Sequence, residues 1–474
     1  MRLSITILLS LVINYGNPGA AQQPSAAAIR SGRTNCSSPQ LLVISLDGFR
    51  YDYYDKIVMK SLQSFAARGA HATKGMTGVF ATVTLASHYT LATGLYEESH
   101  GIVGNRFYDP ATNTTFDKHS HEAHFFKGEP IWVTAKRQGK RTAVYNWVGG
   151  ETDWGDNSPD VAPSFSNHVS LQKRVDQVID NLEHDHLDLI MLYYFQPDRS
   201  SHQHGALSDD VVRELGIIDH EFERMFNIMD KKGLTDNVNI IILADHGVMN
   251  LTTDPLIMIQ SDHPLLLNHT DRVIPGDVVT HVFPKPGGDH EEQTIAHLNY
   301  LLEKRGHFKV YAKKDIPDRW HFRHSPRIAP VIIVADPGYF IIVYKGSEDP
   351  HNKHVDKGNH GYDNHEGRMN PLFMAAGPDF KQNYSFSQSF QNTNIYPLLC
   401  HLMRIQAAHN NGSFAQVSHM TRHSVIQPCS SDVLLNPPSW TSLGSELLIF
   451  VMGETFRLIN TGFLIHSIVC RLRA

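Results

Sequence analysis

The segment LLVISLD, residues 41–47, is an almost entirely apolar run that ends in a carboxylate. A short run of this kind predicts a strand that is buried on both faces, as the strands of a parallel sheet are. Similar runs follow at residues 142–147, 187–194, 238–243 and 372–375. Because helical patterns lie between these runs, the sequence predicts an α/β fold with a central, mainly parallel sheet flanked by helices.

Two of the helical patterns are well defined. Ser170 is the expected N-cap of the first, which continues through Val175 and Ile179. The second is longer and is expected to stop at Gly233. Its apolar positions are Val211, Leu215, Ile218, Phe222, Met225 and Met229.

Residues 265–350 have a different sequence pattern from the rest of the chain. Their shorter predicted elements indicate a small α+β insert or lid within the catalytic unit. Its last two strands are expected to form a pair, with Asp336-Pro337-Gly338 as the turn between them. The expected elements are strands at 278–283 and 308–312, a helix at 291–304, and the strand pair at 331–333 and 339–343.

Composition limits the classes of protein to consider. The chain has 474 residues, of which 41% are hydrophobic and 19% charged, which is typical of a folded protein with a large core. The formal net charge is −6, and no basic stripe is present. We therefore expect no stable nucleic-acid partner.

The N-terminal segment indicates the secretory pathway. Residues 1–21 combine Arg2, an apolar run and the small residues Gly19-Ala20-Ala21, which is the pattern of a signal peptide. A buried N-terminal strand is the alternative interpretation. Six Asn-x-Ser/Thr sequons fit an extracellular or cell-surface glycoprotein. They begin at Asn35, Asn113, Asn250, Asn268, Asn383 and Asn411.

Residues 431–474 are expected to form a tail, and the segment from Leu447 to Cys470 within it is apolar on balance. Basic residues follow this segment, as they follow a membrane span on its cytoplasmic side. Glu454 and Arg457 interrupt it, so both a membrane anchor and an amphipathic terminal helix remain open. The chain has 4 cysteines, and a Cys400–Cys429 disulfide is one pairing that an oxidising compartment allows.

Three carboxylates follow predicted strands. Asp47 ends the first, Asp198 follows the run at 187–194, and Asp245 follows the run at 238–243. Ligands of open α/β sheets bind outside the carboxyl ends of the strands, so these three acids are expected to converge on one crevice. Each alone could instead cap the helix or turn that follows its strand.

Histidines accompany these acids. His202 lies four positions after Asp198, which suits one face of a helical turn, and His246 is adjacent to Asp245. His360 lies in a loop framed by glycines, at residues 358–364. Mixed imidazole and carboxylate ligands favour zinc, and three of each suit two ions rather than one. Two metals about 4 Å apart can hold both the attacking and the leaving oxygen of a phosphoryl displacement.

A nucleophile candidate lies in residues 80–90, where a helical pattern begins near Thr84. A hydroxyl at a helix start lies at the positive end of the helix dipole, where a phosphate also binds well. A metal can activate such a hydroxyl. The alternative is that Thr84 is only the N-cap of the helix.

These residues lie within motifs that resemble the ectonucleotide pyrophosphatase/phosphodiesterase family of the alkaline-phosphatase superfamily. The resemblance covers residues 39 to about 420, and the expected catalytic domain is 39–430. It is closest to the short branch with a single catalytic domain. The matching motifs occur in order: SLDGFR (45–50), HYTLATGLYEESHGIVGN (88–105), YDP (108–110), KGEPIWVTA (127–135), PDRSSHQHG (197–205), ADHGV (244–248) and GNHGYDN (358–364).

The resemblance implies a role for each site residue. Thr84 would be the nucleophile and would form a threonyl-phosphate intermediate. The side-chain amide of Asn105 would hold a phosphate oxygen. A nucleotide base would stack between Leu85 and Phe165, although leucine stands where the family has an aromatic ring. One zinc ion would be held by Asp47, Thr84, Asp245 and His246, and the other by Asp198, His202 and His360.

The expected activity is hydrolysis of extracellular nucleotides such as ATP, dinucleoside polyphosphates or NAD to a nucleoside monophosphate. A lysophospholipid or choline phosphodiesterase using the same site is the first alternative, since Leu85 also suits an acyl group. A second alternative is a cell-surface adhesion or receptor ectodomain on an inactive scaffold, which the complete ligand set argues against.

Overall fold

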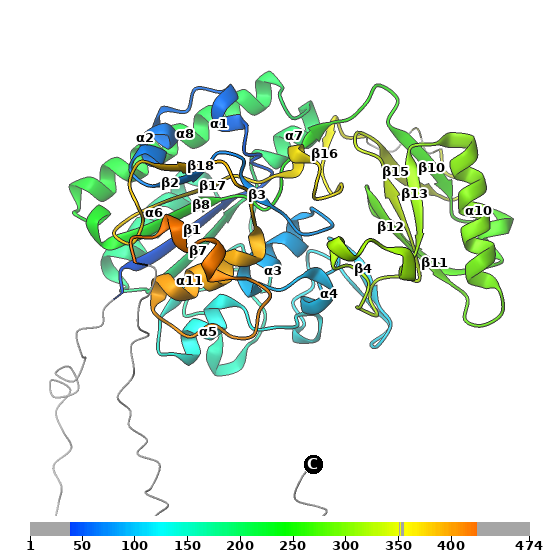
Figure 1. The fold of residues 1–474 in the computed structure, drawn as a ribbon, viewed down its shortest axis with the longest axis horizontal. Coiled ribbons are helices and arrows are strands. Elements are labelled where there is room, and N and C mark those ends of the chain that lie inside the picture. The colour runs from blue at the N-terminus through cyan, green and yellow to red at the C-terminus, as the bar shows by residue number, and fades with distance from the viewer. Residues whose placement is uncertain (1–37, 350, 352–354, 424–474) are drawn as a thin grey trace, which may run out of the picture. The chain divides into compact units, whose positions relative to one another are not determined.

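The computed structural model describes residues 38–349, 351 and 355–423, and its core is one seven-stranded sheet, drawn in Figure 1. The order across the sheet is β18-β2-β17-β8-β1-β7-β6. Only β17 runs antiparallel to its neighbours, so the predicted mainly parallel α/β sheet is confirmed. The strands are β1 (Gln40–Leu46), β2 (Ala70–Ala72), β6 (Thr142–Tyr145), β7 (Leu189–Tyr194), β8 (Val238–Leu243), β17 (Phe373–Ala376) and β18 (Tyr384–Phe386).

Both faces of this sheet are buried, as the continuous apolar runs predict. Alternate residues of β1 point to opposite faces: Leu42 and Ile44 pack with one hydrophobic cluster, and Leu41 and Val43 with another. The first cluster includes residues of α2 (Lys60–Ala67), α6 (Leu171–His184) and α8 (Asp209–Lys231). The second includes residues of α5 (Ile131–Arg137), α11 (Ile395–Met403) and the end of α3 (Thr84–Thr93).

The two predicted helical patterns are confirmed as α6 and α8. The Ser170 hydroxyl caps α6 by accepting a hydrogen bond of 3.3 Å from the backbone nitrogen of Lys173. The predicted apolar positions of α8 are all buried. Gly233, with φ of 67°, follows the end of α8, where a left-handed conformation favours glycine.

The insert forms a separate, smaller substructure that lies beside the main sheet (Figure 1). An antiparallel sheet, in the order β11-β12-β14-β13, packs against helix α10 (His290–Arg305). A separate parallel pair joins β10 and β15. The strands are β10 (Leu256–Gln260), β11 (Thr270–Ile274), β12 (Val279–Pro284), β13 (Phe308–Ala312), β14 (Val331–Ala335) and β15 (Phe340–Tyr344).

The predicted pairing of the last two strands of the insert is wrong. The turn at residues 336–338 exists, with the Tyr339 nitrogen donating to the Asp336 carbonyl at 3.0 Å. However, β14 pairs with β12 and β13, while β15 pairs with β10, which lies about 80 residues earlier in the chain.

A buried ion pair links the YDP motif to the chain that precedes β14. The Arg327 guanidinium, 2% exposed, donates to Oδ2 of Asp109 at 2.7 and 2.9 Å. It also donates to the carbonyls of Gly101 and His124. Because the charge is paired and its donors are used, this contact satisfies the conditions under which a buried guanidinium is tolerated.

The predicted signal peptide (1–21) and tail (431–474) lie outside the described residues. Cys429, the expected disulfide partner of Cys400, also lies outside them, and Cys400 is buried. Among the helices of the described ranges, none combines the length and apolar character that crossing a membrane requires. Five of the six sequon asparagines lie in the described part of the chain, and all five are exposed. They are Asn113, Asn250, Asn268, Asn383 and Asn411.

Candidate active site

The three strand-end acids lie together at the carboxyl edge of the main sheet. Because β7 and β8 flank β1 in parallel, the chain segments that leave these strands meet at one edge. Two backbone hydrogen bonds link them: the Asp198 nitrogen donates to the Asp47 carbonyl at 3.0 Å, and the Gly48 nitrogen donates to Oδ1 of Asp245 at 3.1 Å. The structure therefore brings Asp47, Asp198 and Asp245 into one crevice.

One group of ligand atoms centres on His246. Its Nε2 lies 3.3 Å from Oδ1 of Asp47 and 3.2 Å from Oδ2 of Asp245. The Thr84 hydroxyl oxygen lies 3.2 Å from the same nitrogen. Separations of this size are those of neighbouring ligands around one metal ion.

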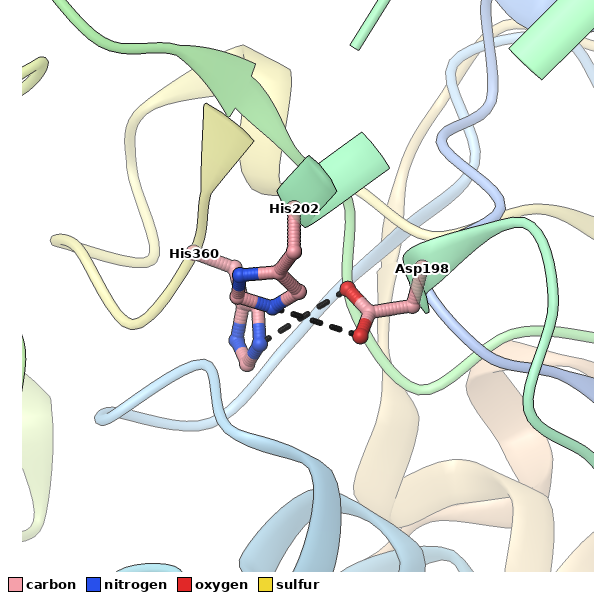
Figure 2. Close-up of side chains that lie close together, drawn as sticks. All are labelled: Asp198, His202 and His360. Carbon is pink, nitrogen blue, oxygen red and sulfur yellow. Dashed lines mark ion pairs between the residues drawn. The ribbon is translucent and has the colours of Figure 1, made fainter. Parts of the chain in front are cut away.

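A second group centres on Asp198, at the first residue of α7 (Asp198–His204). Figure 2 shows His202 and His360 directed at its two carboxylate oxygens, with separations of 3.3 Å and 3.7 Å. Ligand atoms of Asp198, His202 and His360 all lie within 4.8 Å of one another, and those of Asp47, Asp198 and His246 do as well. Asp198 is therefore shared between the two groups, which places them side by side.

Each histidine is oriented through its other ring nitrogen. Nδ1 of His246 lies 3.0 Å from the Gly247 carbonyl, and Nδ1 of His360 lies 2.9 Å from the Thr82 carbonyl. Nδ1 of His202 lies 2.7 Å from Oδ2 of Asp356. Carbonyl and carboxylate partners at Nδ1 require the proton there, which leaves Nε2 as a lone-pair donor directed at the cluster.

The buried carboxylates need cations nearby. Oδ1 of Asp47, Oδ1 of Asp198 and Oδ2 of Asp245 have no hydrogen-bond donor within the part of the chain that the structure describes. Burial, together with the Asp245 charge, raises the pKa of Asp47 well above its usual range. Burial also raises the pKa of Asp245 to about 7. Divalent cations would compensate these charges, and the mixed imidazole and carboxylate donor set fits metal ions.

Thr84 is the first residue of α3, and the N-cap is Val83, so the interpretation of Thr84 as a simple N-cap is wrong. Its hydroxyl points instead to the His246 side of the cluster. The neighbouring Leu85 nitrogen donates to Oδ1 of Asn105 at 2.9 Å. This bond commits the amide oxygen of Asn105 to the backbone, so its Nδ2 is the group that can donate to a phosphate oxygen.

A cavity of about 700 Å³ opens over the cluster. Thr84, Asn105, Leu85 and Phe165 all contribute to its lining. Phe165 is 42% exposed, and its backbone nitrogen donates to Oε1 of Glu151 at 2.8 Å. The two candidate base contacts therefore share one cavity with the proposed nucleophile.

Three supporting residues were not assigned a role from the sequence. The Tyr193 hydroxyl donates to Oδ2 of Asp47 at 2.5 Å, and Asp356 holds His202. His88 lies 2.8 Å from both the Ser45 hydroxyl and the Thr84 carbonyl, and burial lowers its pKa to about 4. Tyr193 could have been found from its place near the end of a predicted strand, whereas no pattern marks Asp356.

Comparison with known proteins shows the family to which the chain is related. Residues 41–363 match the family profile described as type I phosphodiesterase / nucleotide pyrophosphatase. The bis(5'-adenosyl)-triphosphatase of Xenopus laevis is 33% identical over 389 residues, covering 81% of both chains. Human ectonucleotide pyrophosphatase/phosphodiesterase family member 5 is 33% identical over 412 residues, covering 84% of this chain and 82% of that protein.

A solved structure shows the same fold. The inactive threonine-to-alanine variant of murine ectonucleotide pyrophosphatase/phosphodiesterase 5, in complex with AMP, superposes with a TM-score of 0.73 at 32% identity. The match covers 81% of this chain and 100% of the murine chain. The profile match spans more than half of the chain, and with these relatives it shows that the chain belongs to the type I phosphodiesterase/nucleotide pyrophosphatase family of hydrolases.

Proposed function

We propose that the protein is a two-zinc phosphodiesterase/pyrophosphatase that hydrolyses extracellular nucleotides through a covalent intermediate on Thr84. The observation that carries this proposal is the position of the Thr84 hydroxyl, 3.2 Å from Nε2 of His246, at the start of α3. When bound, the zinc ions would lower the pKa of the attacking groups and neutralise charge on the phosphate. Asp47, Asp245, His246 and Thr84 would hold one ion, and Asp198, His202 and His360 the other.

Hydrolysis would take two displacements at phosphorus, the first by Thr84 and the second by water. The Thr84 hydroxyl loses its proton to solvent, and its oxygen forms a bond to phosphorus as the bond to the leaving-group oxygen breaks. The leaving group takes up a proton from solvent. The Asn105 amide and the N-terminal end of α3 hold the non-bridging phosphate oxygens. Water then breaks the threonyl-phosphate ester, which releases the nucleoside monophosphate and restores the Thr84 hydroxyl.

The cavity lining supports an anionic leaving group. Arg106, Lys118 and Arg199 line the same cavity as Thr84. Five acids line the cavity as well. Glu151 accepts from the Phe165 nitrogen, and Asp117 accepts from the His119 nitrogen at 2.8 Å. The other three belong to the ligand cluster or orient it: Asp47, Asp198 and Asp356. These cationic side chains suit a polyphosphate. Aromatic residues such as Trp147 and Phe165 line the same cavity and suit a base or a choline headgroup, so the cations are the feature that favours a nucleotide.

The names of relatives point in the same direction. The Xenopus relative is a bis(5'-adenosyl)-triphosphatase, and the murine neighbour holds AMP. A threonine-to-alanine change inactivates that neighbour, which supports a threonine nucleophile here. We further propose an extracellular or cell-surface location with N-glycans on the exposed sequons, and attachment to the membrane through the C-terminal segment.

The test is hydrolysis by the purified full chain. Substrates are a dinucleoside triphosphate, ATP, NAD, lysophosphatidylcholine, glycerophosphocholine and an aryl phosphomonoester, each with and without a strong chelator. We expect release of nucleoside monophosphate, loss of this activity with chelator, and recovery with Zn²⁺. Preferential cleavage of the choline esters would favour the lipid alternative. Zinc-loaded protein that cleaves none of the substrates would favour an adhesion or receptor role.

A further inference from the structure

A second cluster of histidine and aspartate lies outside the active site, in the insert. It consists of His269, just before β11, and Asp289 and His290 at the start of α10. One ligand atom from each lies within 4.8 Å of the other two. Figure 1 places α10 at the edge of the insert that faces away from α3, where Thr84 lies.

The local fold explains why these residues meet. β11 and β12 form an antiparallel pair, and the Lys285 nitrogen extends their hydrogen bonding by donating to the His269 carbonyl at 2.8 Å. The chain then turns back through Gly287 and Gly288, whose φ angles of 77° and 60° favour glycine. This tight loop returns Asp289 and His290 to the side chain of His269.

The distances suit a metal ion. Nδ1 of His269 and Nδ1 of His290 lie 3.0 Å apart. Two imidazole nitrogens that bind one zinc ion tetrahedrally at about 2.0–2.1 Å are separated by about 3.3 Å. Nε2 of Gln293 donates to Oδ2 of Asp289 at 3.0 Å, which orients the carboxylate, as partners of metal ligands commonly do.

We propose that His269, Asp289 and His290 bind a zinc ion that is separate from the catalytic pair. Two imidazoles and one carboxylate favour zinc among the common divalent ions, and water completes the tetrahedron on the solvent side, where Asp289 is exposed. The ion joins the start of β11 to the first turn of α10 and so closes the glycine loop. Its role is to fix α10 on the insert, and no reacting group is involved.

The first test compares zinc content. Full-length wild type, His290→Ala and His220→Ala are each equilibrated with Zn²⁺, freed of unbound metal by gel filtration and analysed for zinc. His220, 73% exposed on α8, is the matched control because it is a helical histidine away from both clusters. We expect His290→Ala to lose one zinc equivalent relative to wild type, while His220→Ala loses none.

A second variant keeps the proposal testable if His290→Ala does not fold. Asp289→Asn preserves side-chain size but removes the anionic ligand, so it should also lose the additional equivalent. In both variants, Zn²⁺ should no longer protect the loop at residues 285–290 from limited proteolysis, whereas nucleotide hydrolysis should continue. Equal zinc content and equal protection in wild type and both variants would overturn the proposal and show that the two histidines only share a hydrogen bond.

Discussion

The Tyr193 hydroxyl lies 2.5 Å from Oδ2 of Asp47, and both residues are nearly completely buried. Tyr193 lies on β7, opposite Ser45 of the adjacent parallel strand β1, and Asp47 directly follows β1. The bond leaves Oδ1 of Asp47 directed at Nε2 of His246. Tyr193 is therefore a positioning residue, because it fixes the carboxylate that the proposed zinc ion needs.

Tyr193→Phe should weaken zinc binding and activity without large changes to the fold. Removing a partner of a metal ligand typically costs about 10- to 100-fold in metal affinity or activity. Tyr194→Phe is the control, because the Tyr194 hydroxyl is directed at Glu214, at 3.4 Å, rather than at the cluster. Chelator titration of residual activity gives the apparent zinc affinity. Equal affinities in the two variants would show that Asp47 does not depend on Tyr193.

Phe165→Ala should affect nucleotide substrates selectively. Base–aromatic stacking is worth about 1–3 kcal/mol, which corresponds to a loss of roughly 5- to 150-fold in kcat/KM. Because Phe165 is 42% exposed, removal of its ring should cost little stability. An aryl phosphonate ester too small to reach Phe165 serves as the control substrate. If both substrates lose activity equally, the ring packs against the protein rather than against a base.

Glu97 predicts a pH dependence of stability that is separate from the metal cluster. It is the first residue of α4 (Glu97–His100) and is 0% exposed, and burial raises the pKa of its carboxyl well above the usual range. The folded protein therefore retains a proton that the unfolded chain releases near its ordinary pKa of about 4.3. The contribution of this carboxyl to the free energy of unfolding is fully present below that pH. It is lost as the pH rises through the folded-state pKa.

Glu97→Gln has no such proton to lose, so the stability of wild type relative to this variant should fall as pH rises. The measurement is the free energy of urea unfolding of both proteins at about pH 4.5 and about pH 8. Titration of the metal ligands is common to both proteins and cancels in the difference. An identical pH dependence in the two proteins would mean that Glu97 is charged in the folded state.

The sequence was sufficient to predict the candidate site where a local sequence pattern coincides with a general rule of α/β folds. Asp47, Asp198 and Asp245 follow apolar strands, and a parallel sheet brings the ends of such strands to one edge. It was not sufficient for β15, because the turn at residues 336–338 specifies a change of direction but not a partner. The partner, β10, is distant in the chain, and apolar strands of similar length carry little information about which of them pair.

The supporting contacts of the site were the least predictable. Asp356 orients His202 from a segment outside regular structure, where no periodicity distinguishes one acid from another. His360 is oriented by the backbone carbonyl of Thr82, whose position depends on tertiary structure and not on residue type. Candidate ligands that follow strands can therefore be predicted from their place in the sequence, whereas the groups that orient them can be identified only in the folded structure.

The most direct test of the mechanism is a series of substitutions in α3. Thr84→Ala removes both the proposed attacking oxygen and one zinc contact, so hydrolysis of a nucleotide phosphodiester should fall by several orders of magnitude. Thr84→Ser retains the hydroxyl and should keep measurable activity, with some loss because serine lacks the methyl group that restricts the threonine rotamer. Steady-state rates should be measured with the zinc content of each variant.

Ser87→Ala is the matched control, because Ser87 lies in the first turn of the same helix and its buried hydroxyl has no hydrogen-bond partner among the described residues. Thr82 is a poor control: its hydroxyl donates to the Tyr362 carbonyl and accepts from the Gly361 nitrogen, and so supports the loop that carries His360. Thr82→Ala should therefore lower activity through zinc loss, whereas Thr84→Ala should lower it even at full zinc content. If zinc-loaded Thr84→Ala turns over at nearly the wild-type rate, Thr84 is not the nucleophile and water must attack the phosphorus directly.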